Sequence, residues 1–386
     1  MGNLNRKIGS GDAQRFDQKN MMYRRLLWDP TVQDFAPEWY AQRVIGDRPG
    51  YTLKEWALQC AAWYVERAVA KGNQTGNFGL YNWEVDPNEF AVITRLVPGQ
   101  KYAVSNPAQM SQDIKRVAKF LGAGLTGICR LDRRWIYSHA YSHAFDGATH
   151  VHTPLEIPEE YEYAIVIAVE MDYLTIKTSP ATTQLAAQGD GYSKMPFVAS
   201  RLAHFIRTLG YKAIPCGNDT ALSIPLAIDA GLGQLGRNGV LITEKFGPRC
   251  RLCKVFTNLP LVPDEPIEFG VTEFCNTCRR CAENCPGRAI LFGEPTDQPI
   301  NISNNGGIFK WPIDAEKCLR FWVQNDCSSC SNCIMVCPFN KPMGWLHDMT
   351  RFFVGNAPWL DSLLVRLDKA FGYGKRIKTE QFWAGS

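Results

Sequence analysis

Two runs of closely spaced cysteines constrain this chain more than any other feature. Both runs have the form C-x-x-C-x-x-C-x-x-x-C-P, and their cysteines are Cys275, Cys278, Cys281 and Cys285, then Cys327, Cys330, Cys333 and Cys337. This is the spacing of bacterial ferredoxins, in which three thiolates on one loop bind one cluster and the fourth reaches the other. A zinc site would use four cysteines in two pairs and leave the others idle. The spacing therefore predicts two [4Fe–4S] clusters.

The second run leaves the identity of one cluster ligand undecided, because Cys318 lies nearby and this region then has one cysteine more than the cluster needs. Crosswise ligation assigns one cluster to Cys275, Cys278, Cys281 and Cys337. It assigns the other cluster to Cys285, Cys330, Cys333 and either Cys318 or Cys327. Twelve of the 14 cysteines lie after position 200, a concentration unlike that of a secreted chain stapled by disulfides.

Composition bounds the rest of the chain. Its 386 residues exceed one ordinary domain, so we expect two or three units. With 45% hydrophobic and 21% charged residues, a packed globular state is favoured over disorder. The net charge of +4 is too balanced to predict a nucleic-acid partner. No apolar run reaches the roughly 18 residues that a membrane span needs.

Local patterns predict helices and short strands in mixed order. We expect helices at 52–71, 109–121, 192–209 and 221–230, and strands at 125–131, 163–170, 239–243 and 253–257. Thr52 and Glu55 form a capping box at the first helix start. The fold class is α+β. We divide the chain into an N-terminal extension and helical region (1–105), a catalytic domain (106–265), a two-cluster domain (266–345) and a C-terminal tail (346–386).

A glycine motif and a histidine group allow more than one interpretation. Gly231-x-Gly233-x-x-Gly236 matches a dinucleotide motif, but the preceding IPLAIDA looks helical where a strand is required. Close backbone approach to a large planar or phosphate-bearing cofactor fits better, with Gly233, Gly236 and Arg237 as candidate cofactor-binding residues.

The histidine group consists of His139, His143, His150 and His152, within 14 residues. A metal site and a set of solvated or capping histidines are both compatible with it. The polar surroundings favour the second interpretation.

Two clusters imply an electron path that ends at another redox cofactor, which we expect within residues 100–260. No flavin motif is persuasive, and the cobalamin signature Asp-x-His-x-x-Gly is absent. At this point the sequence resembles the corrinoid-dependent reductive dehalogenases. The resemblance runs through RFDQKNMMYRRLLWDP (15–30), TSPATTQ to GYSKM (178–195), FIRTLGYKAIPCGNDTALSIPLAIDAGLGQLGRNGVLIT (205–243), FGPRCRLCKVFTNLPL (246–261) and CPFNKP (337–342).

The resemblance implies a nitroreductase-like corrinoid-binding domain followed by a two-[4Fe–4S] ferredoxin-like domain, with cobalamin bound base-off. It implies replacement of a halogen of an organohalide by hydrogen, using Co(I) corrinoid and electrons relayed through the clusters, as in organohalide respiration. Tyr192 matches the family's proton-donating tyrosine, Arg251 its basic partner and Asn218 a third polar residue of the site. Trp322 resembles a pocket tryptophan, and its position favours Cys318 over Cys327 as the ligand. Without the resemblance, each would be read as an ordinary packing or turn residue.

Pocket shape should depend on how Trp322, Tyr81 and Trp83 converge.

We expect a separate electron donor, and a membrane-anchor subunit and a homodimer are compatible with the family. No twin-arginine leader is present, so the chain is expected at the outer face of the cytoplasmic membrane if a leader was removed, and in the cytoplasm otherwise. The alternatives are a tRNA-modifying enzyme like epoxyqueuosine reductase, whose acid is an aspartate, and a non-catalytic iron–sulfur electron carrier.

Overall fold

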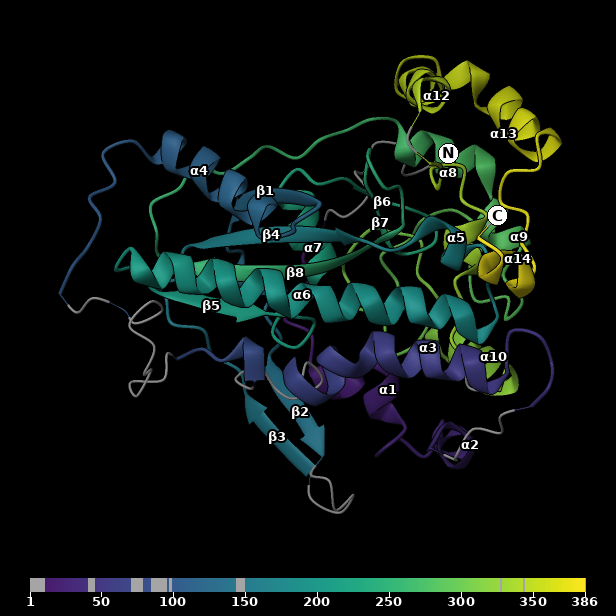
Figure 1. The fold of residues 1–386 in the computed structure, drawn as a ribbon, viewed down its shortest axis with the longest axis horizontal. Helices are drawn as coiled ribbons and strands as arrows, with labels where there is room; N and C mark the ends of the chain where they lie inside the picture. Colours follow the sequence, from purple (N-terminus) through teal and green to yellow (C-terminus); the bar gives the residue numbers. More distant parts are fainter. Residues whose placement is uncertain are drawn as a thin grey trace.

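The computed structural model describes residues 11–40, 46–70, 79–84, 96, 99–143, 150–326, 328–342 and 344–385. Its centre is a four-stranded antiparallel sheet in the order β1-β4-β8-β5 (Figure 1). The strands are β1 (Leu125–Arg130), β4 (Tyr163–Glu170), β5 (Ala213–Cys216) and β8 (Cys250–Thr257). Strand β4 reads YAIVIAVE, an unbroken apolar run typical of a strand buried on both faces.

Helices cover both faces of this sheet. On one face, Ile165 and Ile167 of β4 pack with Met195 and Leu202 of α6 (Thr182–Thr208), and α4 (Pro107–Phe120) contributes to the same core. On the other face, α7 (Ser223–Asp229) packs over the alternate residues of the strands. Figure 1 shows α6 running along the sheet, with α3 beside it. The predicted strands 125–131 and 163–170 and the helices at 109–121 and 221–230 are confirmed to within two residues.

Two elements differ from expectation. Helix α6 begins ten residues before the predicted start at 192, because its first turns are buried polar residues that hide the helical pattern. Gln184 and Gln188 there bond to the Ser329 and Ser331 hydroxyls or backbone. Helix α3 (Leu53–Tyr64) starts at the predicted capping box and continues as a π-helical segment, η3 (Val65–Ala70), that periodicity does not reveal.

Residues 11–40 pack against the body. They form η1 (Gln18–Asn20), α1 (Met22–Arg25), η2 (Gln33–Phe35) and α2 (Ala36–Tyr40). Buried Arg25 pairs with Asp29 at 2.7 Å and with Glu316 of α10 at 2.7 Å. This segment therefore contacts the cysteine-rich region directly. Our division into four units stays a prediction.

Smaller elements complete the architecture. They are η4 (Gly79–Tyr81), η5 (Arg133–Trp135), α5 (Tyr173–Ile176) and two hairpins, β2 (His139–His143) with β3 (His150–Pro154) and β6 (Gln234–Leu235) with β7 (Leu241–Ile242). The predicted strand 239–243 is thus only two residues long, whereas 253–257 belongs to the longer β8.

The remaining helices belong to the cysteine-rich region and the C-terminal tail. They are α8 (Val271–Cys278), α9 (Arg280–Glu283), α10 (Ala315–Gln324), α11 (Asn332–Met335), α12 (Trp345–Asn356), η6 (Pro358–Leu360), α13 (Asp361–Ala370) and α14 (Thr379–Trp383). Within the described ranges, no helix combines the length and apolar character needed to cross a bilayer.

Candidate active site

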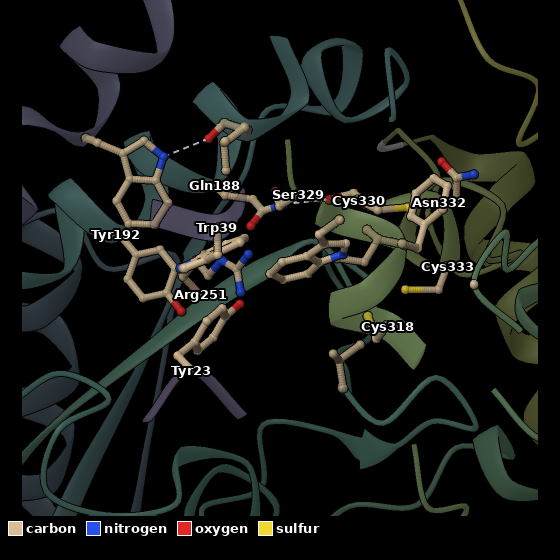
Figure 2. Close-up of a pocket in the computed structure, with 18 of the residues that line it drawn as sticks. Tyr23, Trp39, Gln188, Tyr192, Arg251, Cys318, Ser329, Cys330, Asn332 and Cys333 are labelled. Atoms are coloured by element: carbon tan, nitrogen blue, oxygen red, sulfur yellow. Dashed lines mark hydrogen bonds between the residues drawn. The ribbon is translucent and has the colours of Figure 1, made fainter. Parts of the chain in front are cut away.

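A cavity of about 1010 Å³ lies between the sheet domain and the cysteine-rich region. Its wall draws on the N-terminal segment, α3, α6, β8, α10 and α11. Figure 2 shows Tyr192 and Arg251 on one side of this cavity and Cys318, Cys330 and Cys333 on the other. The cavity therefore joins residues that are far apart in the sequence and that carry different chemistry.

Tyr192, Asn218 and Arg251 come together as predicted. Tyr192 is on α6, Asn218 follows β5, and Arg251 is near the start of β8. The Asn218 side-chain amide donates to the Tyr192 phenol oxygen at 2.8 Å. The guanidinium carbon of Arg251 lies 4.8 Å from the Tyr192 ring centroid. Because the phenol oxygen accepts from Asn218, its own hydrogen is free to point elsewhere.

A buried lysine fixes the orientation of Asn218. The Ser223 hydroxyl donates to Asn218 Oδ1 at 3.2 Å, which turns the amide nitrogen toward Tyr192. Lys254, fully buried in β8, donates to that hydroxyl at 3.0 Å and to the Ala221 carbonyl at 2.9 Å, and it also bonds the Gly217 carbonyl. Burial lowers the pKa of Lys254. These bonds connect the loop after β5 to the central sheet and hold the donor in place.

Close packing brings Tyr192 and Arg251 into contact. A Cβ at Gly191 would lie 2.9 Å from Arg251 Cγ, so only glycine allows β8 to approach α6 this closely. The indole of Trp63, on α3, stacks on the Tyr192 ring at 5.0 Å between centroids. Trp63 is itself anchored, since its indole N–H donates to the Leu185 carbonyl at 3.1 Å. The phenol is thus held between an indole and a cation.

The cysteines gather into the two sets that crosswise ligation predicts. The thiol charges that act on Cys337 come from Cys275, Cys278 and Cys281. Those that act on Cys318 come from Cys330 and Cys285. All four residues of the second set, Cys285, Cys318, Cys330 and Cys333, line the cavity. Cys333 is also affected by Cys281, so the two sets are neighbours.

Burial disfavours charge on these thiols. It raises the pKa of Cys318 to about 12, with the nearby Cys330 and Cys285 adding to the effect. It raises the pKa of Cys330 to about 11, although the Asn332 backbone and Ser179 hydroxyl oppose the shift. Thiolates are stable here only if cations compensate them, which fits iron as the natural occupant of both sets. Cys327 lies outside the described residues, and the choice of Cys318 stays a prediction that the geometry favours.

Three aromatic residues form another wall. The rings of Tyr23, Trp39 and Trp322 lie 5.7 to 6.3 Å apart between centroids. Sequence reasoning singled out Trp322 but missed Tyr23 and Trp39. For Tyr23 the signal was the family resemblance of residues 15–30, which gave no role to individual side chains, and that segment ends before Trp39.

The cavity suits a large cofactor with a polar periphery. Its volume is at the upper end of the range of about 300–1,000 Å³ for small-molecule sites. Three buried polar atoms on its wall lack a protein partner: Arg251 Nε, Trp322 Nε1 and Glu66 Oε2. Gln188, Ser329 and Ser331 add amide and hydroxyl groups. Among the described lining residues there is no histidine, which fits a corrinoid bound without a protein imidazole below the metal.

The glycine-rich segment serves the protein's own packing. A Cβ at Gly233 would lie 2.1 Å from the Ile242 carbonyl oxygen, and one at Gly236 would lie 2.8 Å from Asn238 Oδ1. Buried Arg237 donates to the carbonyls of Cys275, Leu291 and Gly293 at 2.8 to 3.0 Å.

The described lining residues of the cavity include Asn238 and Val240 but not Gly233, Gly236 or Arg237. The cofactor-binding role of Gly233, Gly236 and Arg237 stays a prediction.

Two further aromatics lie elsewhere. Tyr81 is buried beneath Gly217, whose Cβ would lie 3.0 Å from the ring, and Trp83 packs against the core on the other face of the sheet. Neither belongs to the described cavity wall. Our expectation that they shape the pocket was wrong, because Tyr81 packs in the core beside α6 and Trp83 against the core on the opposite face of the sheet.

Comparisons with known proteins agree with this site. Residues 274–340 match a family model described as a 4Fe–4S double cluster binding domain. The tetrachloroethene reductive dehalogenase of Sulfurospirillum multivorans is 36% identical over 352 residues, which cover 85% of this chain and 70% of that protein. One from Desulfitobacterium hafniense is 35% identical over 394 residues, covering 86% and 70%.

A solved structure titled as a reductive dehalogenase, suggesting a mechanism for B12-dependent dehalogenation, superposes with a TM-score of 0.71 at 23% identity. The match covers 96% of this chain and 49% of that one. The chain belongs to the reductive dehalogenases, a family of oxidoreductases. The predicted family, fold class, enzyme class and pair of [4Fe–4S] clusters are therefore confirmed. The alternatives of a tRNA-modifying enzyme and of a plain electron carrier are set aside.

Proposed function

We propose that this reductive dehalogenase replaces a chlorine of a small chlorinated ethene by hydrogen and takes the proton from Tyr192. The observation that carries the proposal is the 2.8 Å bond from the Asn218 amide to the Tyr192 oxygen, at the wall of a cavity whose far side holds four cysteines. With its oxygen occupied as an acceptor, the phenol directs its hydrogen toward the substrate space.

The reaction consumes two electrons and one proton, breaks a carbon–chlorine bond, forms a carbon–hydrogen bond and releases chloride. When bound, the corrinoid supplies the reducing metal and the clusters supply electrons singly. Cys275, Cys278, Cys281 and Cys337 would hold one cluster, and Cys285, Cys318, Cys330 and Cys333 the other.

Tyr192 gives up its proton to the carbon and becomes a phenolate. The Asn218 N–H and the Arg251 guanidinium stabilise that negative charge, the second without losing its own proton. Both groups are in position before reaction, so no reorganisation is needed when the charge develops. Trp63 keeps the ring from rotating.

The wall of Tyr23, Trp39 and Trp322 supports an apolar substrate. A chlorinated ethene offers no hydrogen-bonding groups, so dispersion and burial of apolar surface must hold it. Relatives named for tetrachloroethene support this choice. A separate electron donor completes the scheme.

The decisive assay uses anaerobically purified, cofactor-loaded enzyme with reduced viologen and a panel of chlorinated ethenes, ethanes and phenols. We expect stoichiometric chloride and the product with one chlorine fewer from the ethenes. The same protein containing iron but no corrinoid is the control. Absence of halide release across the panel by fully loaded enzyme would contradict the proposal.

We further propose that the enzyme works at the outer face of the cytoplasmic membrane, against a membrane-anchor subunit. The support is an exposed aromatic surface on α12, η6 and α13: Trp345 is 76% exposed, Trp359 81% and Phe371 73%. Surfaces of this kind mark interaction sites.

The double variant Trp345→Ser/Trp359→Ser should move the protein from the membrane fraction to the soluble fraction of host cells, with unchanged activity in solution. An unchanged membrane fraction would refute this role. Sedimentation of the same two proteins would show whether the surface instead joins two copies.

A further inference from the structure

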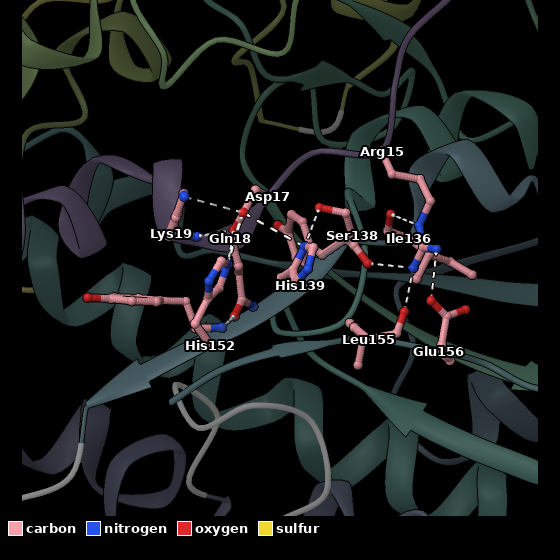
Figure 3. A network of polar contacts seen from close by, with 12 residues as sticks. Arg15, Asp17, Gln18, Lys19, Ile136, Ser138, His139, His152, Leu155 and Glu156 are labelled. Carbon is pink, nitrogen blue, oxygen red and sulfur yellow. Dashed lines mark hydrogen bonds and ion pairs between the residues drawn. The ribbon is translucent and has the colours of Figure 1, made fainter. Parts of the chain in front are cut away.

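A second polar cluster lies away from the cavity, between the N-terminal segment and the β2–β3 hairpin. It consists of Asp17, which precedes η1, His139 at the start of β2 and His152 in β3 (Figure 3). One ligand-type atom from each residue lies within 4.8 Å of those from the other two. The dehalogenation chemistry proposed above uses none of them.

The distances suit a metal ion. His152 Nε2 lies 2.9 Å from Asp17 Oδ2, and His139 Nδ1 lies 3.8 Å from the same oxygen. Zinc bonds nitrogen and oxygen at about 2.0–2.2 Å, so neighbouring ligand atoms in a tetrahedron are roughly 3.3 Å apart. The two distances bracket that value. The centroids of the two imidazole rings lie 4.6 Å apart.

The carboxylate is oriented for this task. Asp17 Oδ1 accepts the Lys19 backbone N–H at 2.9 Å and lies 3.2 Å from His152 Nε2, while Oδ2 lies nearer to that nitrogen, at 2.9 Å. The side chains of Asp17, His139 and His152 are 18%, 38% and 35% exposed, so an ion can enter and keep a water ligand. The nearest cation, Lys19 Nζ, is 4.0 Å from Oδ2 on a side chain that is 39% exposed and can turn to solvent.

We propose that Asp17, His139 and His152 bind one divalent ion of the zinc class, with water in the remaining position. Two imidazoles and a carboxylate form a borderline ligand set that suits zinc and neighbouring transition metals and disfavours magnesium and calcium. The thiolate sets of the cluster region are chemically distinct from it.

The position of the ion gives it a structural role. Gln18, the next residue, donates to the Asp219 carbonyl at 2.6 Å and accepts the Tyr141 N–H at 2.8 Å. On the other side, Arg15 donates to the Tyr137 carbonyl at 2.8 Å. The ion would attach the segment around Asp17 to the β2–β3 hairpin. This attachment lies just before Tyr23, which lines the cavity. Bound metal thus orders one wall of the cavity from outside.

The test measures zinc on untagged holoenzyme whose cysteines already carry iron. After dialysis against micromolar zinc, elemental analysis should find one zinc per chain in the wild type. Asp17→Asn, which keeps the helix cap, and His139→Ala and His152→Ala should each weaken zinc binding at least tenfold. His204→Ala, in α6, is the matched control and should bind like the wild type.

X-ray absorption at the zinc edge of the wild type provides a readout independent of the variants. We expect nitrogen and oxygen neighbours at about 2.0–2.1 Å with imidazole scattering, and none at the 2.3 Å of a zinc–sulfur bond. Bound zinc should also raise the unfolding temperature of the wild type and leave that of His152→Ala unchanged.

A wild type that retains no zinc would show that Asp17 and His152 form only an ion pair, and would overturn the proposal. Sulfur neighbours, or equal zinc in wild type and triad variants, would do the same. None of these outcomes depends on dehalogenation.

Discussion

The two sides of the cavity are built in opposite ways. On the Tyr192 side, the polar groups satisfy one another through a chain from Lys254 to Ser223 to Asn218 to the phenol, all on a helix, a sheet and one short loop. On the cysteine side, buried thiols gather with raised pKa values, and the charges of Arg237 and Arg280 oppose this shift only in part. The protein alone completes the first side, whereas the second depends on iron for its stability.

The largest effect is expected from a substitution on the Tyr192 side of the cavity. Tyr192→Phe removes the transferable proton but keeps the ring that stacks on Trp63. We expect turnover to fall by about 10²–10⁴-fold, the range for loss of a general acid. Halide release is the measurement, with iron and cobalt contents as controls that should not change. Near-normal turnover would remove this phenol from the mechanism.

A smaller loss of turnover is expected when Asn218, which donates a hydrogen bond to Tyr192, is replaced. Asn218→Ala removes the hydrogen bond at 2.8 Å that fixes the phenol oxygen as acceptor and stabilises the phenolate. Turnover should fall by about 10–100-fold, because Arg251 still provides positive charge. Substrate KM should stay constant, since Asn218 acts on the proton donor. A raised KM with unchanged turnover would show that Asn218 binds substrate instead.

Replacing a cluster ligand should halve the iron content of the protein. Cys318→Ser should reduce iron from about eight to about four per chain, because one whole cluster loses a ligand. Cys327→Ser is the matched variant and should retain all the iron. Iron analysis after reconstitution separates the two; the reverse pattern would assign the ligand to Cys327.

The smallest effect concerns Glu66, a buried carboxyl on the π-helical segment at the cavity wall. Burial raises its pKa to about 8, and Asp219 adds to the shift while Arg67 opposes it. The folded state therefore holds this proton more tightly than the unfolded chain, whose carboxyl titrates near 4.5. Between those values the free energy of unfolding falls as pH rises.

Glu66→Gln mimics the protonated form and should escape this loss. We expect the unfolding temperature of the wild type to fall by several degrees relative to the variant between pH 6 and pH 9. Parallel curves for the two proteins would show that Glu66 does not titrate in this window.

Sequence alone predicted the residues that carry the chemistry better than it predicted the residues that enclose the cavity. Cysteine spacing predicted one thiolate set in full and three members of the other, because ligand order on a short loop dictates which sulfurs can converge, and it left Cys318 or Cys327 open as the last ligand. The apolar run at 163–170 predicted β4. Tyr192, Asn218 and Arg251 required the family resemblance, since contact between α6, the loop after β5 and β8 is a property of the whole sheet.

The aromatic wall was missed for the same reason. Tyr23 and Trp39 meet Trp322 through contacts that span almost three hundred residues, among them the Arg25–Glu316 ion pair. The start of α6 was missed because buried Gln184 and Gln188 bond to a distant loop and not to water.

The Arg25–Glu316 pair also has an evolutionary consequence. Since residues 11–40 supply part of the substrate enclosure but none of the proposed proton-transfer groups, selectivity can diversify there without disturbing turnover. Grafting residues 15–40 between relatives, with the partner at position 316 kept acidic, offers a modular route to new halocarbon preferences.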